Sequence, residues 1–139
     1  MKISLTKEFS FEMAHALKGY DGACKNIHGH SYRLFVTISG EPIQDKNSSK
    51  YGMIMDFGDL KQIINASIID RFDHALVLNE EHHFGEISDT KLVCTAFQPT
   101  CENLLIHFAE LIQPLLPPNV RLEKLKMHET ATSYAELEL

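Results

Sequence analysis

Two histidines, His28 and His30, stand at the start of a run of alternating apolar and polar residues in this 139-residue chain. Alternate residues of a β-strand point the same way, about 7 Å apart, so both imidazoles could bind one metal ion. His15 ends an earlier strand-like segment, and a hairpin would bring it alongside. Three histidines are the ligand set of an open catalytic zinc site, which keeps a position for water or substrate. The spacing therefore favours a metal site over unrelated surface histidines.

Cys24 lies four residues before His28, on a polar segment that contains glycine. Its thiolate could be a fourth ligand, which would close the metal site as a structural cluster. Alternatively, a thiolate favoured by the nearby metal and imidazoles would act as a base or nucleophile. The spacing leaves both roles open. The other two cysteines, Cys94 and Cys101, are expected to be inert, buried, free thiols.

Two carboxylates add to the candidate chemistry. Asp73 directly precedes His74, and a carboxylate that orients an imidazole is a general acid–base device, although neighbours on a strand point apart. Glu129 ends a strand-like segment, where it could bind the N–H edge of a guanidine-like heterocycle or simply be solvated. The remaining histidines are expected to be loop, helix-surface and strand residues without chemistry: His82, His83, His107 and His128.

The elements that must position these groups follow from hydrophobic periodicity. Segments 3–15 and 31–38 alternate and predict a hairpin around a loop at 18–30, and segments 120–129 and 133–139 predict two closing strands. Apolar residues three and four apart predict helices over 56–70 and from Thr100, a plausible N-cap, to Pro114. A short apolar run at 75–78 and a candidate small strand at 93–97 lie between them. This order predicts an α+β fold, an antiparallel four-stranded sheet with two helices packed on one face.

Composition narrows the class of protein further. The length predicts one domain over residues 1–139, and 44% hydrophobic residues argue against disorder. A net charge of −6 argues against nucleic-acid binding, which needs clustered cations. The N-terminus carries no signal-peptide core and no stretch approaches a membrane span, so a cytoplasmic protein without a membrane partner is expected.

Six motifs then occur in an order typical of one family. They are His15 in Phe11-Glu12-Met13-Ala14-His15, Cys24-x3-His28-Gly29-His30-Ser31-Tyr32, Met55-Asp56-Phe57, Asp73-His74-x2-Val77-Leu78-Asn79, Pro99-Thr100-x-Glu102-Asn103 and Glu129-Thr130-x3-Tyr134. Together, over about residues 3–137, the chain resembles the 6-pyruvoyltetrahydropterin synthase / 6-carboxytetrahydropterin synthase family. The resemblance implies a T-fold (tunnelling fold) that assembles into barrels, as trimers paired into a homohexamer.

The resemblance also implies a role for each candidate residue. His15, His28 and His30 would hold Zn²⁺, Cys24 would be the catalytic base, and Asp73 with His74 would relay protons. Glu129 would anchor the pterin, and Glu102 and Thr100 would lie near the pterin pocket. The short Cys24–His28 spacing and Ser31 favour the 6-carboxy enzyme of queuosine (7-deazapurine) synthesis, a lyase acting on 7,8-dihydroneopterin triphosphate.

Two alternatives remain at this level, together with some unexplained features. One is a 6-pyruvoyl synthase or related pterin side-chain lyase, and the other is a non-catalytic assembly protein with a structural zinc site.

The connections at 41–50 and 80–91 are longer than compact members require and could alter the pocket rim or the assembly. The triphosphate needs cations, for which Lys18, Lys25 and Arg33 are candidates by proximity in sequence only.

Overall fold

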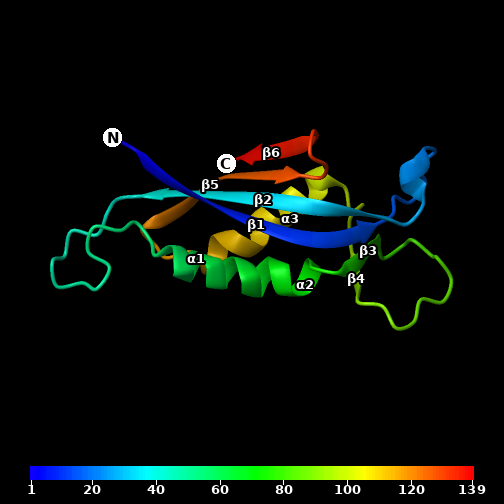
Figure 1. Cartoon of the computed structure of the whole chain (residues 1–139), viewed down its shortest axis with the longest axis horizontal. Helices are drawn as coiled ribbons and strands as arrows, with labels where there is room; N and C mark the ends of the chain where they lie inside the picture. The colour runs from blue at the N-terminus through cyan, green and yellow to red at the C-terminus, as the bar shows by residue number, and fades with distance from the viewer.

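A six-stranded sheet in the order β4-β3-β1-β2-β5-β6 forms the centre of the computed structural model, which describes residues 1–139 (Figure 1). The strands are β1 (Ile3–His15), β2 (His28–Gly40), β3 (Ala75–Asn79), β4 (Leu92–Thr95), β5 (Val120–His128) and β6 (Tyr134–Glu138). The helical segments are η1 (Ala23–Lys25), α1 (Phe57–Ile64), η2 (Asn65–Ile69), α2 (Asp70–Phe72), α3 (Cys101–Ile112) and η3 (Gln113–Leu115).

The α+β class and the helices on one face are confirmed, but the expected four-stranded antiparallel sheet is wrong. β3 and β4 extend the sheet beyond β1, and both pair in parallel. β3 could not be recognised from the sequence because its first four residues are all buried, so apolar and polar residues do not alternate along it. A short run that is apolar on both faces cannot be told from a buried helix by periodicity.

The β1–β2 hairpin is the longest pairing and carries the histidines at one end. It runs from Ile3 opposite Gly40 to His15 opposite His28, so β2 begins three residues before the expected start at Ser31. Odd residues of β1 and even residues of β2 face the helices. His15, His28 and His30 therefore continue the buried rows that build the core.

Helix packing fixes the core beneath this hairpin. Asp56 caps α1 by accepting a 2.6 Å hydrogen bond from the Gly58 amide. The expected continuous helix over 56–70 is instead interrupted by the π-helical η2, whose wider turn is not encoded by a three-and-four spacing. On α3, Phe108 packs edge-on against Phe11 of the sheet at 6.3 Å and against Phe72 of α2 at 5.2 Å between ring centroids.

β5 contains a bulge that changes which residues face the core. Thr37 pairs with Lys124 and Ile38 pairs with Leu122, which leaves Glu123 without a register partner in β2. Before the bulge the even residue Leu122 is buried, and after it the odd residues Leu125 and Met127 are buried. The extra residue thus keeps both halves of β5 facing the helices.

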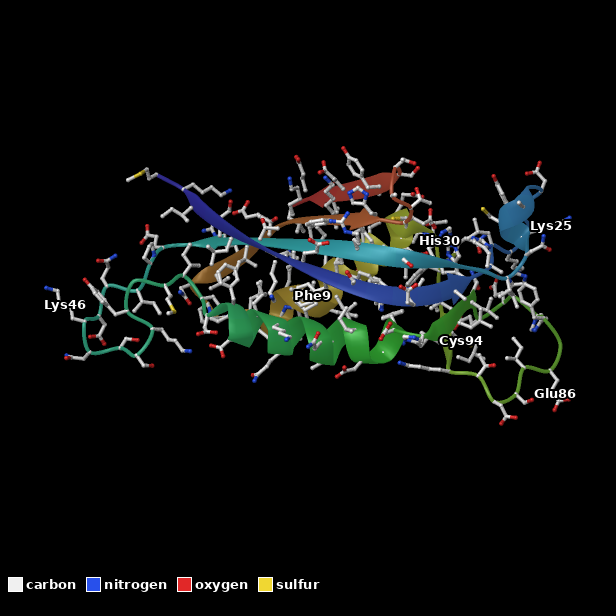
Figure 2. All side chains as sticks on the ribbon, viewed as in Figure 1. Phe9, Lys25, His30, Lys46, Glu86 and Cys94 are labelled. Atoms are coloured by element: carbon white, nitrogen blue, oxygen red, sulfur yellow. The ribbon has the colours of Figure 1, made fainter.

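The two long connections lie at opposite ends of the molecule. Lys46, in the 41–50 connection, is far from His30, whereas Glu86, in the 80–91 connection, lies at the same end as His30 and Lys25 (Figure 2). In the 80–91 connection, Phe84 and Ile87 pack on a small cluster of Ala16, Leu76 and Leu78. Only the 80–91 connection is therefore placed to shape the site. None of the helices has both the length and the apolar character needed to cross a membrane.

Candidate active site

The three predicted histidines converge at the end of the β1–β2 hairpin. One nitrogen from each imidazole lies within 4.8 Å of the other two. His15 comes from the last position of β1, and His28 and His30 come from the first and third positions of β2. His15 is buried and the other two are half-buried, so the cluster is reached from one side. This is the arrangement that three ligands of one ion require.

Backbone carbonyls fix two of the rings. Nδ1 of His15 donates to the Pro99 carbonyl and Nδ1 of His28 donates to the Asn26 carbonyl, each at 2.7 Å. In these neutral rings Nδ1 carries the hydrogen and Nε2 carries the lone pair. Both Nε2 atoms are buried without a hydrogen-bond partner. Burial also lowers the pKa of His15 and His30 below the usual value of 6.5, which favours the neutral form that binds metal. These orphaned nitrogens fit a transition-metal ion.

Glu129 lies against this cluster, one residue beyond β5. Its Oε1 is 3.4 Å from Nε2 of His15 and 3.5 Å from Nε2 of His30. The buried phenol of Tyr32 donates a 3.4 Å hydrogen bond to the same oxygen. Glu129 is therefore more than a solvated strand end. Tyr32 was not among the predicted site residues, and its alternation with His28 and His30 on one strand was the signal that could have placed it here.

Cys24 sits in the short turn η1, which follows β1. Its carbonyl accepts a 2.9 Å hydrogen bond from the Leu17 amide, which ties the turn to the end of β1. The side chain is half-buried and does not belong to the group of close histidine nitrogens. The backbone thus holds Cys24 beside the end of β1, and its thiol is not among the ligand atoms that lie within 4.8 Å of one another.

Asp73 and His74 form a contact but stand apart from the histidine cluster. Asp73 Oδ1 is 3.0 Å from His74 Nδ1 and accepts a 2.9 Å hydrogen bond from the Glu12 amide. The hydrogen bond from the Glu12 amide lowers the pKa of Asp73, and it does so more than the contact with His74. His74 has a left-handed backbone (φ 61°) and a 75% exposed side chain. Lys91, which the sequence reasoning missed, donates to the carbonyls of Asp70 and Asp73 at 2.7 and 2.8 Å.

A cavity of about 620 Å³ connects elements of both groups. It is lined by His30 of the histidine cluster and by His74 of the Asp73–His74 pair (the dyad), together with Glu12 and Ser31. Ile87 and Thr90 of the 80–91 connection form part of its wall. This volume is within the usual range for small-molecule sites.

The Pro99–Glu102 segment supports the cluster from the start of α3. The Thr100 hydroxyl caps α3 by accepting from the Asn103 amide at 3.2 Å, as predicted, and the Pro99 carbonyl holds His15. Glu102 is exposed in the first turn of α3. No hydrogen bond or ion pair joins Glu102 to the three histidines.

The structure corrects two other expectations, for Cys94 and His107, and confirms that for Cys101. Cys101 is buried as predicted, but Cys94 is exposed because alternate residues of the edge strand β4 face outward. His107 is not a plain surface residue: it is half-buried against Phe97 and Phe72, with ring centroids 5.1 and 6.2 Å away.

The candidate cations are largely committed to carboxylates. Lys18 pairs with Glu81 at 3.3 Å and Arg33 pairs with Glu8 at 2.7 Å. Lys25 makes no ion pair and is exposed in the turn beside Cys24. Of the three, Lys25 is the one left available to an anion.

Comparison with known proteins identifies the family. The sequence pattern described as 6-pyruvoyl tetrahydropterin synthase matches residues 4–139. The chain belongs to the 6-pyruvoyl tetrahydropterin synthase family. A relative from Haemophilus influenzae, named 6-carboxy-5,6,7,8-tetrahydropterin synthase, is 34% identical over 95% of this chain and 96% of its own. A relative of the same name from Rickettsia bellii is 29% identical over 97% and 99% of the two chains. Membership in this synthase family makes the chain an enzyme.

Solved structures agree on the fold. The 6-pyruvoyl tetrahydropterin synthase of Caenorhabditis elegans superposes with a TM-score of 0.71 at 25% identity, covering 100% of this chain and 96% of that one. An uncharacterized protein from Wolinella succinogenes superposes with a TM-score of 0.82 at 19% identity, covering 99% and 98%. The T-fold expected from the sequence is confirmed, with six strands in place of four.

Proposed function

We propose that this member of the 6-pyruvoyl tetrahydropterin synthase family is a 6-carboxy-5,6,7,8-tetrahydropterin synthase. It would convert 7,8-dihydroneopterin triphosphate and water to 6-carboxy-5,6,7,8-tetrahydropterin, acetaldehyde and triphosphate. The relatives with this name, 34% and 29% identical over nearly the full chain, support this product over the pyruvoyl one. In this proposal the protein is a cytoplasmic lyase that supplies queuosine synthesis.

The proposed metal is Zn²⁺, held by Nε2 atoms of His15, His28 and His30. The two buried nitrogens without hydrogen-bond partners are the observation that favours a bound ion over a vacant polar cluster. When bound, zinc acts as a Lewis acid that stabilises negative charge on substrate oxygens. The Pro99 and Asn26 carbonyls would keep His15 and His28 in the tautomer that presents Nε2 to it.

The other residues take the roles of base, proton relay and anchor. Cys24, half-buried on its turn, would remove a proton from the substrate side chain as a thiolate. His74 would supply or remove a second proton, oriented by Asp73 at 3.0 Å. Glu129 would accept two hydrogen bonds from the guanidine-like edge of the pterin, which sets the side chain toward the histidines. Thr100 and Glu102 are proposed to line the pterin pocket.

We further propose a homohexamer, a dimer of trimers, as the working unit. In one chain His74 is exposed and Asp73 is half-buried, and no hydrogen bond or ion pair links either residue to the cluster or to Glu129. A site that used all of these groups would be completed by a neighbouring subunit. Such a neighbour would also contribute cations, since Lys18 and Arg33 are already paired within the chain.

Product analysis tests the proposal. Metal-loaded protein is incubated with 7,8-dihydroneopterin triphosphate, and the products are separated and identified by mass spectrometry. Acetaldehyde and 6-carboxytetrahydropterin would support it, whereas a 6-pyruvoyl product would replace it with the pyruvoyl activity. No turnover by metal-loaded protein, together with Cys24 that resists iodoacetamide while metal is bound, would instead favour a structural metal site.

Substitution of Cys24 provides the control for the chemistry. Cys24→Ala should abolish turnover and leave the metal content unchanged, because the thiol is outside the group of histidine nitrogens. Loss of metal from this variant would contradict the role of Cys24 as a base and indicate a fourth ligand.

A further inference from the structure

Tyr32 is the one hydroxyl donor that the structure gives to Glu129 at the histidine cluster. Its side chain is fully buried and stacks on Phe11, with ring centroids 5.2 Å apart and planes 9° from parallel. A buried hydroxyl needs a partner, and the partner here is Oε1 of Glu129 at 3.4 Å. Burial and stacking thus hold the phenol in place as a donor to Glu129.

The imidazoles cannot replace this donor. Nδ1 of His15 donates to the Pro99 carbonyl, so in the neutral ring Nε2 has no hydrogen to offer Glu129. A bound metal would occupy the Nε2 lone pairs of all three histidines in the same way. With a metal bound, Oε1 of Glu129 would thus lie beside histidine nitrogens that do not donate and one hydroxyl that does.

Oε1 also lies at ligand spacing from two of the three histidine nitrogens, although Glu129 is not among the groups whose ligand atoms all lie within 4.8 Å of one another. Around a tetrahedral zinc with bonds of about 2.0–2.1 Å, neighbouring ligand atoms are about 3.3–3.4 Å apart. Oε1 lies 3.4 Å from Nε2 of His15 and 3.5 Å from Nε2 of His30. A shift of the carboxylate toward His28 would bring this oxygen into the fourth coordination position, and the site would then be closed to substrate.

We propose that Tyr32 is a positioning residue that competes with the metal for Oε1 of Glu129, so that the fourth coordination position stays open and the carboxylate stays available to the pterin. This rests on the proposed metal site and pterin anchor. Tyr32 would act through Glu129 and would touch neither the metal nor the substrate. The hydrogen bond turns a potential inhibitory ligand into a binding group.

Tyr32→Phe isolates the hydroxyl because the ring that stacks on Phe11 is retained. Tyr51→Phe is the matched control, since Tyr51 is exposed and directly follows the 41–50 connection, whose Lys46 lies far from His30 (Figure 2). Three quantities are measured: zinc retention against a chelator, neopterin binding by fluorescence, and the visible spectrum of the Co²⁺-substituted protein with and without azide. None of these requires turnover, so they are independent of the identity of the product.

We expect Tyr32→Phe to hold zinc about tenfold more tightly and to bind neopterin about tenfold more weakly, the scale of one hydrogen bond to a charged group. Its Co²⁺ spectrum should no longer respond to azide, whereas wild type and Tyr51→Phe respond. Adding Glu129→Gln should return zinc retention and the azide response toward those of Glu129→Gln alone. Unchanged zinc retention, or weaker retention with a lower melting temperature, would overturn the proposal. Failure of the wild type to bind metal would instead remove the proposed function itself.

Discussion

Removing the cap of α3 should destabilise the fold and loosen the metal site through one short segment. The Thr100 hydroxyl accepts from the Asn103 amide, and the preceding Pro99 carbonyl holds Nδ1 of His15. Replacing a threonine N-cap by alanine costs about 1 kcal/mol. With about 2.1 cal/mol/K of unfolding entropy per residue, 139 residues give about 290 cal/mol/K, so the melting temperature of Thr100→Ala should fall by about 3–4 °C. A displaced Pro99 carbonyl should also weaken metal affinity about tenfold, a typical effect of losing a group that orients a ligand.

The assay is thermal unfolding of metal-free wild type, Thr100→Ala and Thr100→Ser at one protein concentration, followed by metal titration of each. Serine keeps the capping oxygen, so Thr100→Ser should recover most of the stability and the affinity. If Thr100→Ser is as damaged as Thr100→Ala, the cap is not the cause. If both melt like wild type, the reasoning about this segment is refuted. Lost neopterin binding with unchanged metal affinity would point to direct contact of Thr100 with the pterin.

Three further predictions concern residues outside the histidine cluster. Burial, and after it the charge of Arg71, lowers the pKa of His107 below 6.5, so stability present above pH 6.5 is lost as pH falls toward the depressed value. Between pH 7.5 and 5 the melting temperature of His107→Phe should therefore fall less than that of wild type. Equal falls in the two proteins would show that His107 is not the origin of the pH dependence. Lys91→Met removes the donor to the carbonyls of Asp70 and Asp73, so kcat should drop severalfold at unchanged metal content, and a normal kcat would show that the dyad positions itself. A Cβ on Gly40 would lie 2.7 Å from the Asn119 carbonyl oxygen, so Gly40→Ala should cost about 1–3 kcal/mol in urea unfolding, and a neutral effect would show that the loop yields.

The parts of the fold that the sequence predicted are those with one buried face. β1, β2 and β6 alternate cleanly, and α3 has both an apolar stripe and a threonine cap, so each was placed to within a few residues. β3 has no polar face, and its parallel partners lie far away in sequence, so neither its strand state nor the sheet order could be read. The π-helical turn η2 has no local signal, because it depends on how the helix packs.

The candidate site divides in the same way. His28 and His30 are brought together by the period of one strand, and the hairpin register adds His15. Glu129 reaches the cluster through a long-range pairing of β5 with β2, which no local pattern reveals. The role of Tyr32 depends on a hydrogen bond between residues 97 positions apart. Chemistry fixed by local spacing was predictable, whereas chemistry fixed by the sheet order required the structure.

The unpaired residue Glu123 has a consequence for the comparison and redesign of related chains. It shifts the parity of β5, so that Leu125 and Met127 share a face with Leu122. A deletion of this residue leaves the composition and charge pattern of the rest of the strand unchanged. It would nevertheless turn each following side chain to the opposite face and carry the carboxylate of Glu129 away from the histidines. An alignment gap placed one residue off in β5 would therefore equate the carboxylate beside the histidines with a residue on the opposite surface. The number of residues in β5 therefore determines whether Glu129 reaches the histidines, just as the hairpin register determines which histidines meet.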